Sequence, residues 1–217
     1  MDSPAESHQA RLRSRSVERL VTFTDAVVAI AITLIVLPLV DVAQEYRSET
    51  AGAFFAENSL SLLAAALSFV LIASFWKIHH RLYVDVIAST PGLINANLIW
   101  IAAIAFLPLP TVLVIESSGS TSFSSGIYIG TILVTVVAIR VQSTIIVRRG
   151  LRESDAPAIR TSWTNWLTVG LTVIALLIAV VFPATNLFPL FLLLLARPIS
   201  LLVHRGDADR RGLVRNA

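Results

Sequence analysis

The chain has 217 residues, of which 55% are apolar and 14% are charged, and its formal net charge is +3. This composition excludes an ordinary soluble domain, because several apolar stretches reach the roughly 20 residues that a helix needs to span a bilayer. Cysteine is absent, which excludes disulfides, thiolate metal sites and cysteine nucleophiles. The composition therefore predicts an all-α, polytopic membrane protein.

The first apolar segment begins at Arg19 and carries an acidic residue, Asp25, soon after its start. A carboxylate at the centre of a bilayer costs roughly 2.5–3.5 kcal/mol on insertion scales, so it persists where it is paired or functional. Asp25 is therefore the first candidate functional residue.

Six transmembrane helices are predicted. They cover residues 20–40, 59–79, 92–115, 123–147, 163–183 and 187–203. Between the first two, the acid-rich residues 41–58 predict a short helix at the outer membrane surface. Residues 1–18 are polar, and we expect them to be disordered apart from the lead-in to the first helix.

Cationic residues flank the predicted spans on one side of the membrane. They are Arg11, Arg13, Arg15, Arg19, Lys77, Arg81, Arg148, Arg149, Arg152, Arg160, Arg205, Arg210, Arg211 and Arg215. The positive-inside rule then makes both termini cytoplasmic, as an even number of spans requires. Nucleic-acid binding by these arginines is disfavoured, because the clusters stand where topology needs them and lack interleaved aromatic residues.

These spans divide the chain into three parts. Residues 1–18 form a cytoplasmic basic segment, residues 19–204 a six-helix transmembrane domain, and residues 205–217 a cytoplasmic basic tail. We expect no cofactor and no resident metal, because the adjacent His79 and His80 point about 100° apart on a helix and no acidic cluster accompanies them.

Helical geometry gives the first span two faces. Ile30, Leu34 and Leu37 share a stripe with Thr33 beside it, whereas Asp25 lies about 140° from Ile30 around the helix axis. From periodicity alone, the stripe indicates lipid contact or a bundle core.

Polar side chains of the second and third spans stand at the same depth as Asp25. Trp76 and His79 end the second span and Asn95 begins the third. An indole N–H, an imidazole and a carboxamide could each donate to the carboxylate, which would make Asp25 a structural residue. A gating or proton-sensing role for Asp25 is the alternative.

The residues around Asp25 resemble a known family. The sequence Arg19-x-x-x-Phe23-Thr24-Asp25, followed by Ala-Val-x-Ala-Ile-Ala-Ile-Thr-Leu, is similar to the signature of the transmembrane-protein-175 potassium channels, with threonine in place of the usual serine. The resemblance continues through Trp76 and His79, and through Asn95 and Pro108-Leu-Pro110. The second half of the chain matches only in helix count and loop pattern.

This resemblance implies a potassium channel formed as a homotetramer, with the first helices lining a central pore. The use of arginine in place of nearly all lysine indicates a bacterial genome rich in G and C, and hence the bacterial plasma membrane. The resemblance implies that Ile30, Leu34 and Leu37 form the pore constriction and that Thr33 contributes to ion selectivity. It also implies a structural network of the signature residues with the second and third helices, made of Arg19, Phe23, Thr24, Asp25, Trp76, His79 and Asn95. The expected partners are potassium ions, membrane lipid and further copies of the chain.

Two other function classes are considered. A proton-coupled secondary transporter would use Asp25 as its coupling carboxylate. An intramembrane enzyme is disfavoured, because Ser68 and Ser143 have no histidine base at matching depth.

Overall fold

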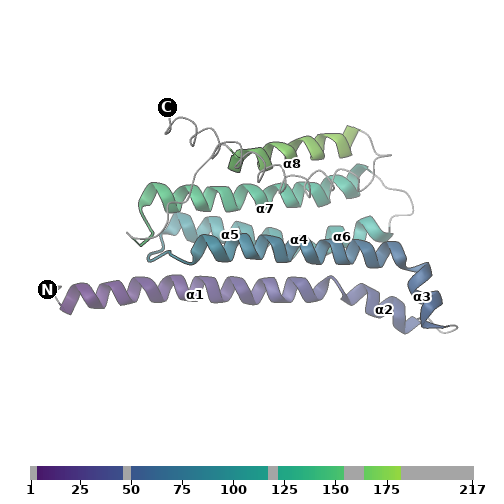
Figure 1. The fold of residues 1–217 in the computed structure, drawn as a ribbon, viewed down its shortest axis with the longest axis horizontal. Helices are drawn as coiled ribbons and strands as arrows, with labels where there is room; N and C mark the ends of the chain where they lie inside the picture. Colours follow the sequence, from purple (N-terminus) through teal and green to yellow (C-terminus); the bar gives the residue numbers. More distant parts are fainter. Residues whose placement is uncertain (1–3, 46–49, 117–121, 154–163, 182–217) are drawn as a thin grey trace, which may run out of the picture.

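The computed structural model describes residues 4–45, 50–116, 122–153 and 164–181, and within them every regular element is a helix (Figure 1). The helices are α1 (Pro4–Leu34), α2 (Leu37–Glu45), α3 (Ala51–Glu57), α4 (Ser59–Tyr83), α5 (Pro91–Phe106), α6 (Pro108–Glu116), α7 (Ser122–Arg149) and α8 (Thr164–Val181). The predicted all-α fold is confirmed. The predicted sixth span, 187–203, and the tail, 205–217, lie outside the described residues.

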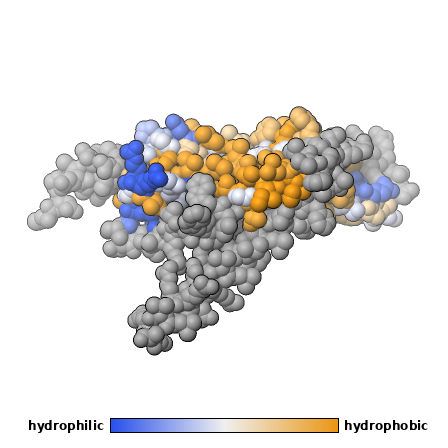
Figure 2. Space-filling view, turned by 90° about the horizontal axis from the view of Figure 1, so that it is seen from above, coloured by the Kyte–Doolittle hydropathy of each residue, from blue (hydrophilic) through white to orange (hydrophobic). Residues whose placement is uncertain are grey.

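Four helical stretches are long and apolar enough to cross a membrane. They are Ser14–Gln44, Ser59–Tyr83, Pro91–Leu113 and Phe123–Arg149, and they coincide with the first four predicted spans. The predicted fifth span, 163–183, corresponds to α8, an 18-residue helix. Figure 2 shows apolar surface across the middle of the visible face and hydrophilic residues gathered toward its two ends. The chain is thus a multi-pass membrane protein.

Helix α1 begins well before the predicted first span. It starts at Pro4, so the expectation of disorder before residue 19 is wrong for residues 4–18. The sequence from Ala5 to Leu34 contains neither glycine nor proline, so nothing in it interrupts a helix. The Ser14 hydroxyl also donates to the Glu18 carboxylate, at 3.0 Å. The boundary predicted between residues 18 and 19 therefore lies inside a continuous helix.

Two predicted spans are interrupted at prolines. The first breaks after Leu34, and α2 starts at Leu37 with Pro38 as its second residue. The third breaks at Leu107, directly before Pro108. A proline ring clashes with the carbonyl of the residue four positions earlier and lacks an N–H, which accounts for both breaks. The acid-rich stretch 41–58, predicted as one short helix, contains the end of α2 and all of α3 instead.

Helices α4 and α5 lie between α1 and α7, and α8 packs on the far side of α7 (Figure 1). The centre of the core is formed by α5 and α7, where Leu93, Trp100 and Ile104 of α5 and Ile132 of α7 are fully buried. This arrangement leaves α1 packed against the bundle on one side only.

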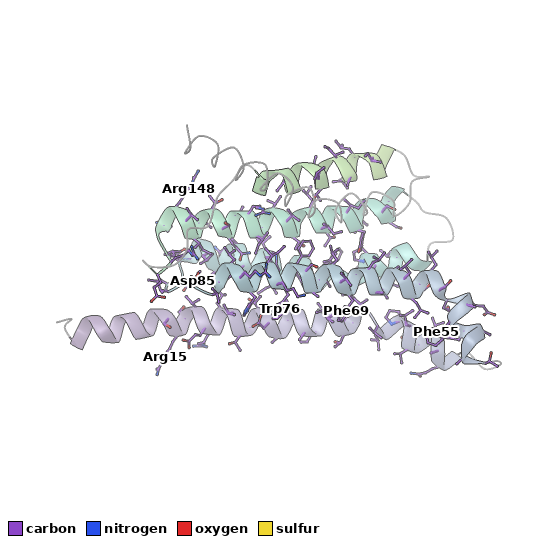
Figure 3. The ribbon with its side chains drawn as sticks, in the orientation of Figure 1. Arg15, Phe55, Phe69, Trp76, Asp85 and Arg148 are labelled. Atoms are coloured by element: carbon purple, nitrogen blue, oxygen red, sulfur yellow. The ribbon has the colours of Figure 1, made fainter. Side chains whose placement is uncertain are left out.

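One end of the bundle carries most of the described positive charge, and we call it the basic end. It contains Arg15, Arg19, Lys77, Arg81, Arg148 and Arg149. Figure 3 shows Arg15, Asp85 and Arg148 at this end of the molecule. Here α5 begins with Pro91, and the Thr90 hydroxyl caps it by accepting from the Leu93 N–H.

Two connections are joined at the basic end. Backbone hydrogen bonds run from Ile87 N–H to the Leu151 carbonyl, at 2.9 Å, and from Glu153 N–H to the Asp85 carbonyl, at 3.1 Å. Arg152 also forms an ion pair with Asp85. These contacts tie the α4–α5 connection to the segment that follows α7.

Candidate functional site

The candidate site is the outward face of α1, together with the polar contacts that fix the opposite face. From Ser14 onward, the buried residues of α1 are Val17, Thr24, Val28 and Ala31, and Ile35 directly after the helix is buried as well. Their spacing of seven, four, three and four residues marks one side of a helix. That side packs on α4 and α5.

The four residues predicted to line a pore are all exposed in the single chain. Ile30 is 59% exposed, Leu34 42% and Leu37 51%, and Thr33 is also exposed. Thr33 lies about 180° around the helix axis from the buried Thr24. The stripe is therefore not part of the core of one chain, which removes one of the two interpretations that periodicity left open.

The helix break divides this stripe. Ile30, Thr33 and Leu34 belong to α1, whereas Leu37 is the first residue of α2. The Val36 N–H bonds to the Thr33 carbonyl at 3.1 Å and tightens the last turn of α1. Leu37 is thus exposed on a second helix.

The Thr33 side chain is held in one orientation. Its hydroxyl donates to the Ile30 carbonyl at 2.8 Å. Because the proton is used in this bond, the lone pairs of the hydroxyl oxygen remain free to accept a hydrogen bond or to contact a cation. An outward oxygen beside apolar Ile30 and Leu34 could replace part of the hydration shell of an ion.

Asp25 accepts a hydrogen bond from the neighbouring helix. The Trp76 indole N–H of α4 donates to Asp25 Oδ1 at 2.8 Å, and both side chains are half-buried. The Trp76 ring also stacks on His80, with ring centroids 5.5 Å apart. Figure 3 shows Trp76 at the side of α4 that meets α1.

A second polar connection joins α1 to α5 and α4 through three fully buried side chains. His79 Nε2 and Asn97 Oδ1 are 2.8 Å apart, and Asn97 Nδ2 donates to Thr24 Oγ1 at 2.8 Å. The Thr24 hydroxyl in turn donates to the Leu20 carbonyl at 2.8 Å. Since Oδ1 can only accept, His79 carries a proton on Nε2 and donates to Asn97.

The predicted network residues divide into those that this geometry brings together and those that it does not. Thr24 and His79 are joined through Asn97, while Asp25 is bonded to Trp76. Arg19, Phe23 and Asn95 are exposed and stand outside these bonds. The sequence predicted Asn95 in this network, whereas the structure has Asn97 there. Because α5 is apolar on all sides, its residue spacing does not distinguish Asn97 from Asn95.

Two further polar contacts were missed. Ser68 of α4 lies 3.1 Å from the Thr111 hydroxyl and 3.0 Å from the Tyr128 hydroxyl, with all three side chains buried. Tyr83 donates to Gln142 at 2.9 Å. Single serine, threonine and glutamine residues in apolar helices give no periodic signal, so the sequence could not pair them. They fix α4, α6 and α7 relative to one another.

No metal centre is formed by the part of the chain that the structure describes: it contains no group of three or more His, Asp or Glu side chains that could hold an ion.

We expect Asn97→Ala to lower stability far more than Asn95→Ala. Removing Asn97 leaves the His79 N–H and the Thr24 oxygen without their partner, at about 1–3 kcal/mol for each buried group. Asn95 is exposed and serves as the matched control, with an expected change within about 0.5 kcal/mol. Size-exclusion profiles of heated, purified protein measure the difference. Equal losses of stability in the two variants would contradict the placement of Asn97 in the buried network.

Substituting Asp25 tests whether the carboxylate is structural. Asp25→Asn keeps an oxygen that can accept from Trp76, whereas Asp25→Ala leaves the indole N–H unpaired, at about 1–3 kcal/mol. The yield of assembled protein should fall in the order wild type, asparagine, alanine, and assembled variants should retain ion flux in liposomes. A stable Asp25→Asn protein without flux would instead make the carboxylate functional.

Comparison with known proteins gives matches of three kinds. The sequence model of the family described as "Endosomal/lysosomal potassium channel TMEM175" matches residues 19–108. A protein from Chamaesiphon minutus described as a potassium channel is 33% identical over 118 residues, which cover 54% of this chain and 54% of that protein. The chain thus matches about half the length of this curated relative.

The third match is a solved structure, the crystal structure of a lysosomal potassium-selective channel TMEM175 homologue from the same organism. It covers 86% of this chain and 97% of that chain, with a TM-score of 0.65 and 21% sequence identity. At this identity the likeness shows a shared fold. This chain is thus similar to the TMEM175 family over residues 19–108, and it shares the fold of the solved homologue.

Proposed function

We propose that the chain is a potassium channel that works as a homotetramer, with α1 of four copies around a central pore. The similarity to the TMEM175 family over residues 19–108 supports cation conduction, and the similar protein from Chamaesiphon minutus is described as a potassium channel.

The observation that carries the proposal is the two-sided character of α1. The side that packs on the bundle buries Thr24, Val28 and Ala31, while the outward face presents Ile30 and Leu34 with an oxygen between them, at Thr33. The Thr33 oxygen can still accept a contact while its proton is bonded to the Ile30 carbonyl. In a water-filled pore this oxygen would contact a partly dehydrated cation.

The apolar residues would form the gate of this pore. Four branched side chains at one level, one from each copy, narrow a pore and expel water from it, and an ion cannot pass where water is excluded. Ile30 and Leu34 stand one turn apart, so four copies would stack two such rings with Thr33 between them. Leu37 would add a third ring at the start of α2.

The orientation in the membrane forms part of the proposal. The basic end carries Arg15, Lys77, Arg81, Arg148 and Arg149, and the positive-inside rule places such an end in the cytoplasm. Both termini would then be cytoplasmic, and the membrane would be the bacterial plasma membrane. The pore would narrow beyond Asp25, toward the external side.

Transport activity distinguishes the channel from a proton-coupled transporter that uses Asp25. Purified protein in liposomes should give unitary ohmic currents under a potassium gradient. Saturable flux that depends on a proton gradient, without unitary currents, would support the transporter. The Trp76 hydrogen bond on Asp25 supports a structural carboxylate and hence the channel.

Shrinking the proposed gate should ease ion passage. Ile30→Ala and Leu34→Ala each widen an apolar ring and lower the cost of wetting, so conductance or open probability should rise, most in the double variant. Val134→Ala on α7, where the side chain is 46% exposed, is the matched control and should leave the currents unchanged. Single-channel recording measures both quantities. Wild-type currents in all three α1 variants would remove these residues from the pore.

Thr33→Val should alter ion preference without disturbing assembly. Valine has nearly the shape of threonine but cannot contact a cation through oxygen, so the potassium-to-sodium permeability ratio should change. The reversal potential under bi-ionic conditions gives this ratio. Thr33→Ser keeps the hydroxyl and serves as the control. A reversal potential common to wild type, serine and valine would place selectivity elsewhere.

A further inference from the structure

One side of α4 is exposed along most of its length and changes character toward the basic end. We call it the α4 outer stripe and define it as Leu63, Val70, Lys77 and Arg81. Their spacing of seven, seven and four residues puts them on one side of the helix. Leu63 is 54% exposed and Val70 57%, and Lys77 and Arg81 are exposed as well.

The cationic part of the α4 outer stripe stands at the depth of lipid headgroups. At 1.5 Å per residue, Lys77 and Arg81 lie about 9 Å and about 3 Å along the axis from Tyr83, where α4 ends. Leu63 and Val70 lie deeper in the same membrane-spanning helix. Long cationic side chains in such places extend toward the membrane surface.

Neither cation of the stripe is neutralised by the residues that the structure describes. Asp85, the acidic residue next along the chain, is paired with Arg152, and Asp25 accepts from Trp76. Lys77 and Arg81 form no ion pair or hydrogen bond within the described ranges. Two positive charges one helical turn apart therefore face outward without an acidic partner.

We propose that the α4 outer stripe binds an anionic phospholipid, with the headgroup phosphate at Lys77 and Arg81 and an acyl chain along Val70 and Leu63. A guanidinium binds phosphate oxygens through two parallel hydrogen bonds, and an ammonium adds a point charge. The apolar half of the stripe, Leu63 and Val70, offers an apolar surface that an acyl chain can contact. A zwitterionic lipid brings its own positive charge and fits two adjacent cations less well.

The proposed lipid site lies next to the hydrogen bond that joins α4 to α1. His80, between Lys77 and Arg81 in sequence, stacks on Trp76, and Trp76 donates to Asp25 of α1. A phosphate held by Lys77 and Arg81 therefore restrains the turn of α4 that carries this hydrogen bond. Bound anionic lipid should stabilise the assembled protein against heat, whether or not the protein conducts ions.

The test measures lipid binding directly and needs no ion flux, so its failure is distinct from failure of the proposed channel. The full chain in detergent is titrated with phosphatidylglycerol or phosphatidylcholine, and native mass spectrometry counts the lipids bound to each subunit. Lys77→Gln with Arg81→Gln should weaken phosphatidylglycerol binding about 25-fold, from about fivefold for each cation removed. The matched control, Arg148→Gln with Arg149→Gln, removes the same charge from α7 and should bind as wild type does.

Charge-preserving substitutions distinguish a loss of lipid binding from misfolding. Lys77→Arg with Arg81→Lys should keep phosphatidylglycerol binding and its protection against heat. If the α4 and α7 glutamine variants lose phosphatidylglycerol binding equally, the proposed site is overturned, because binding then depends only on the overall surface charge. Wild-type protein that binds phosphatidylcholine as tightly as phosphatidylglycerol would also overturn it. Loss of the oligomer in the Lys77 and Arg81 variant, with no change in lipid count per subunit, would assign the stripe to a neighbouring copy instead.

Discussion

The hydrogen bond from Trp76 to Asp25 fixes how α1 is rotated about its own axis. A carboxylate in a membrane helix needs a donor, and α4 supplies one at 2.8 Å. The buried bond from Asn97 to Thr24 acts one residue earlier, from a different helix. These two hydrogen bonds come from two different helices, α4 and α5. Any rotation of α1 about its axis would break one of them and leave a polar group without a partner.

The rest of α1 follows from that rotation. With Thr24 facing α5, the residues about half a turn away must face outward, and Thr33 lies about 180° from Thr24. Ile30 and Leu34 flank it and are exposed, whereas Val28, Ala31 and Ile35 are buried. The interior polar contacts thus determine which apolar residues face the outside. Pro38 follows Leu34 by four residues, and α1 ends at Leu34, so the outward face of α1 ends there as well.

The sequence predicted the helical class, the first four spans and the region of the site, because hydropathy and the cost of a membrane carboxylate depend on composition and local spacing. It did not predict the contacts that need a third dimension. Asn95 and Asn97 are equally polar and stand at the same depth, and only the packing of α5 against α7 selects Asn97 for the buried side. The joining of Asp85 to Arg152 likewise requires that two distant connections meet. The breaks at Pro38 and Pro108 could have been predicted from the residues alone.

The central claim is that the outward face of α1 borders water rather than lipid. The chain contains no cysteine, so a single introduced thiol can be labelled without background. A charged, membrane-impermeant thiol reagent should reduce the potassium current of Thr33→Cys channels in liposomes and leave Leu98→Cys channels unaffected, because Leu98 is exposed on α5 and does not border the proposed pore. A Thr33→Cys current that persists, with the thiol unlabelled, would contradict the account and assign this face of α1 to lipid.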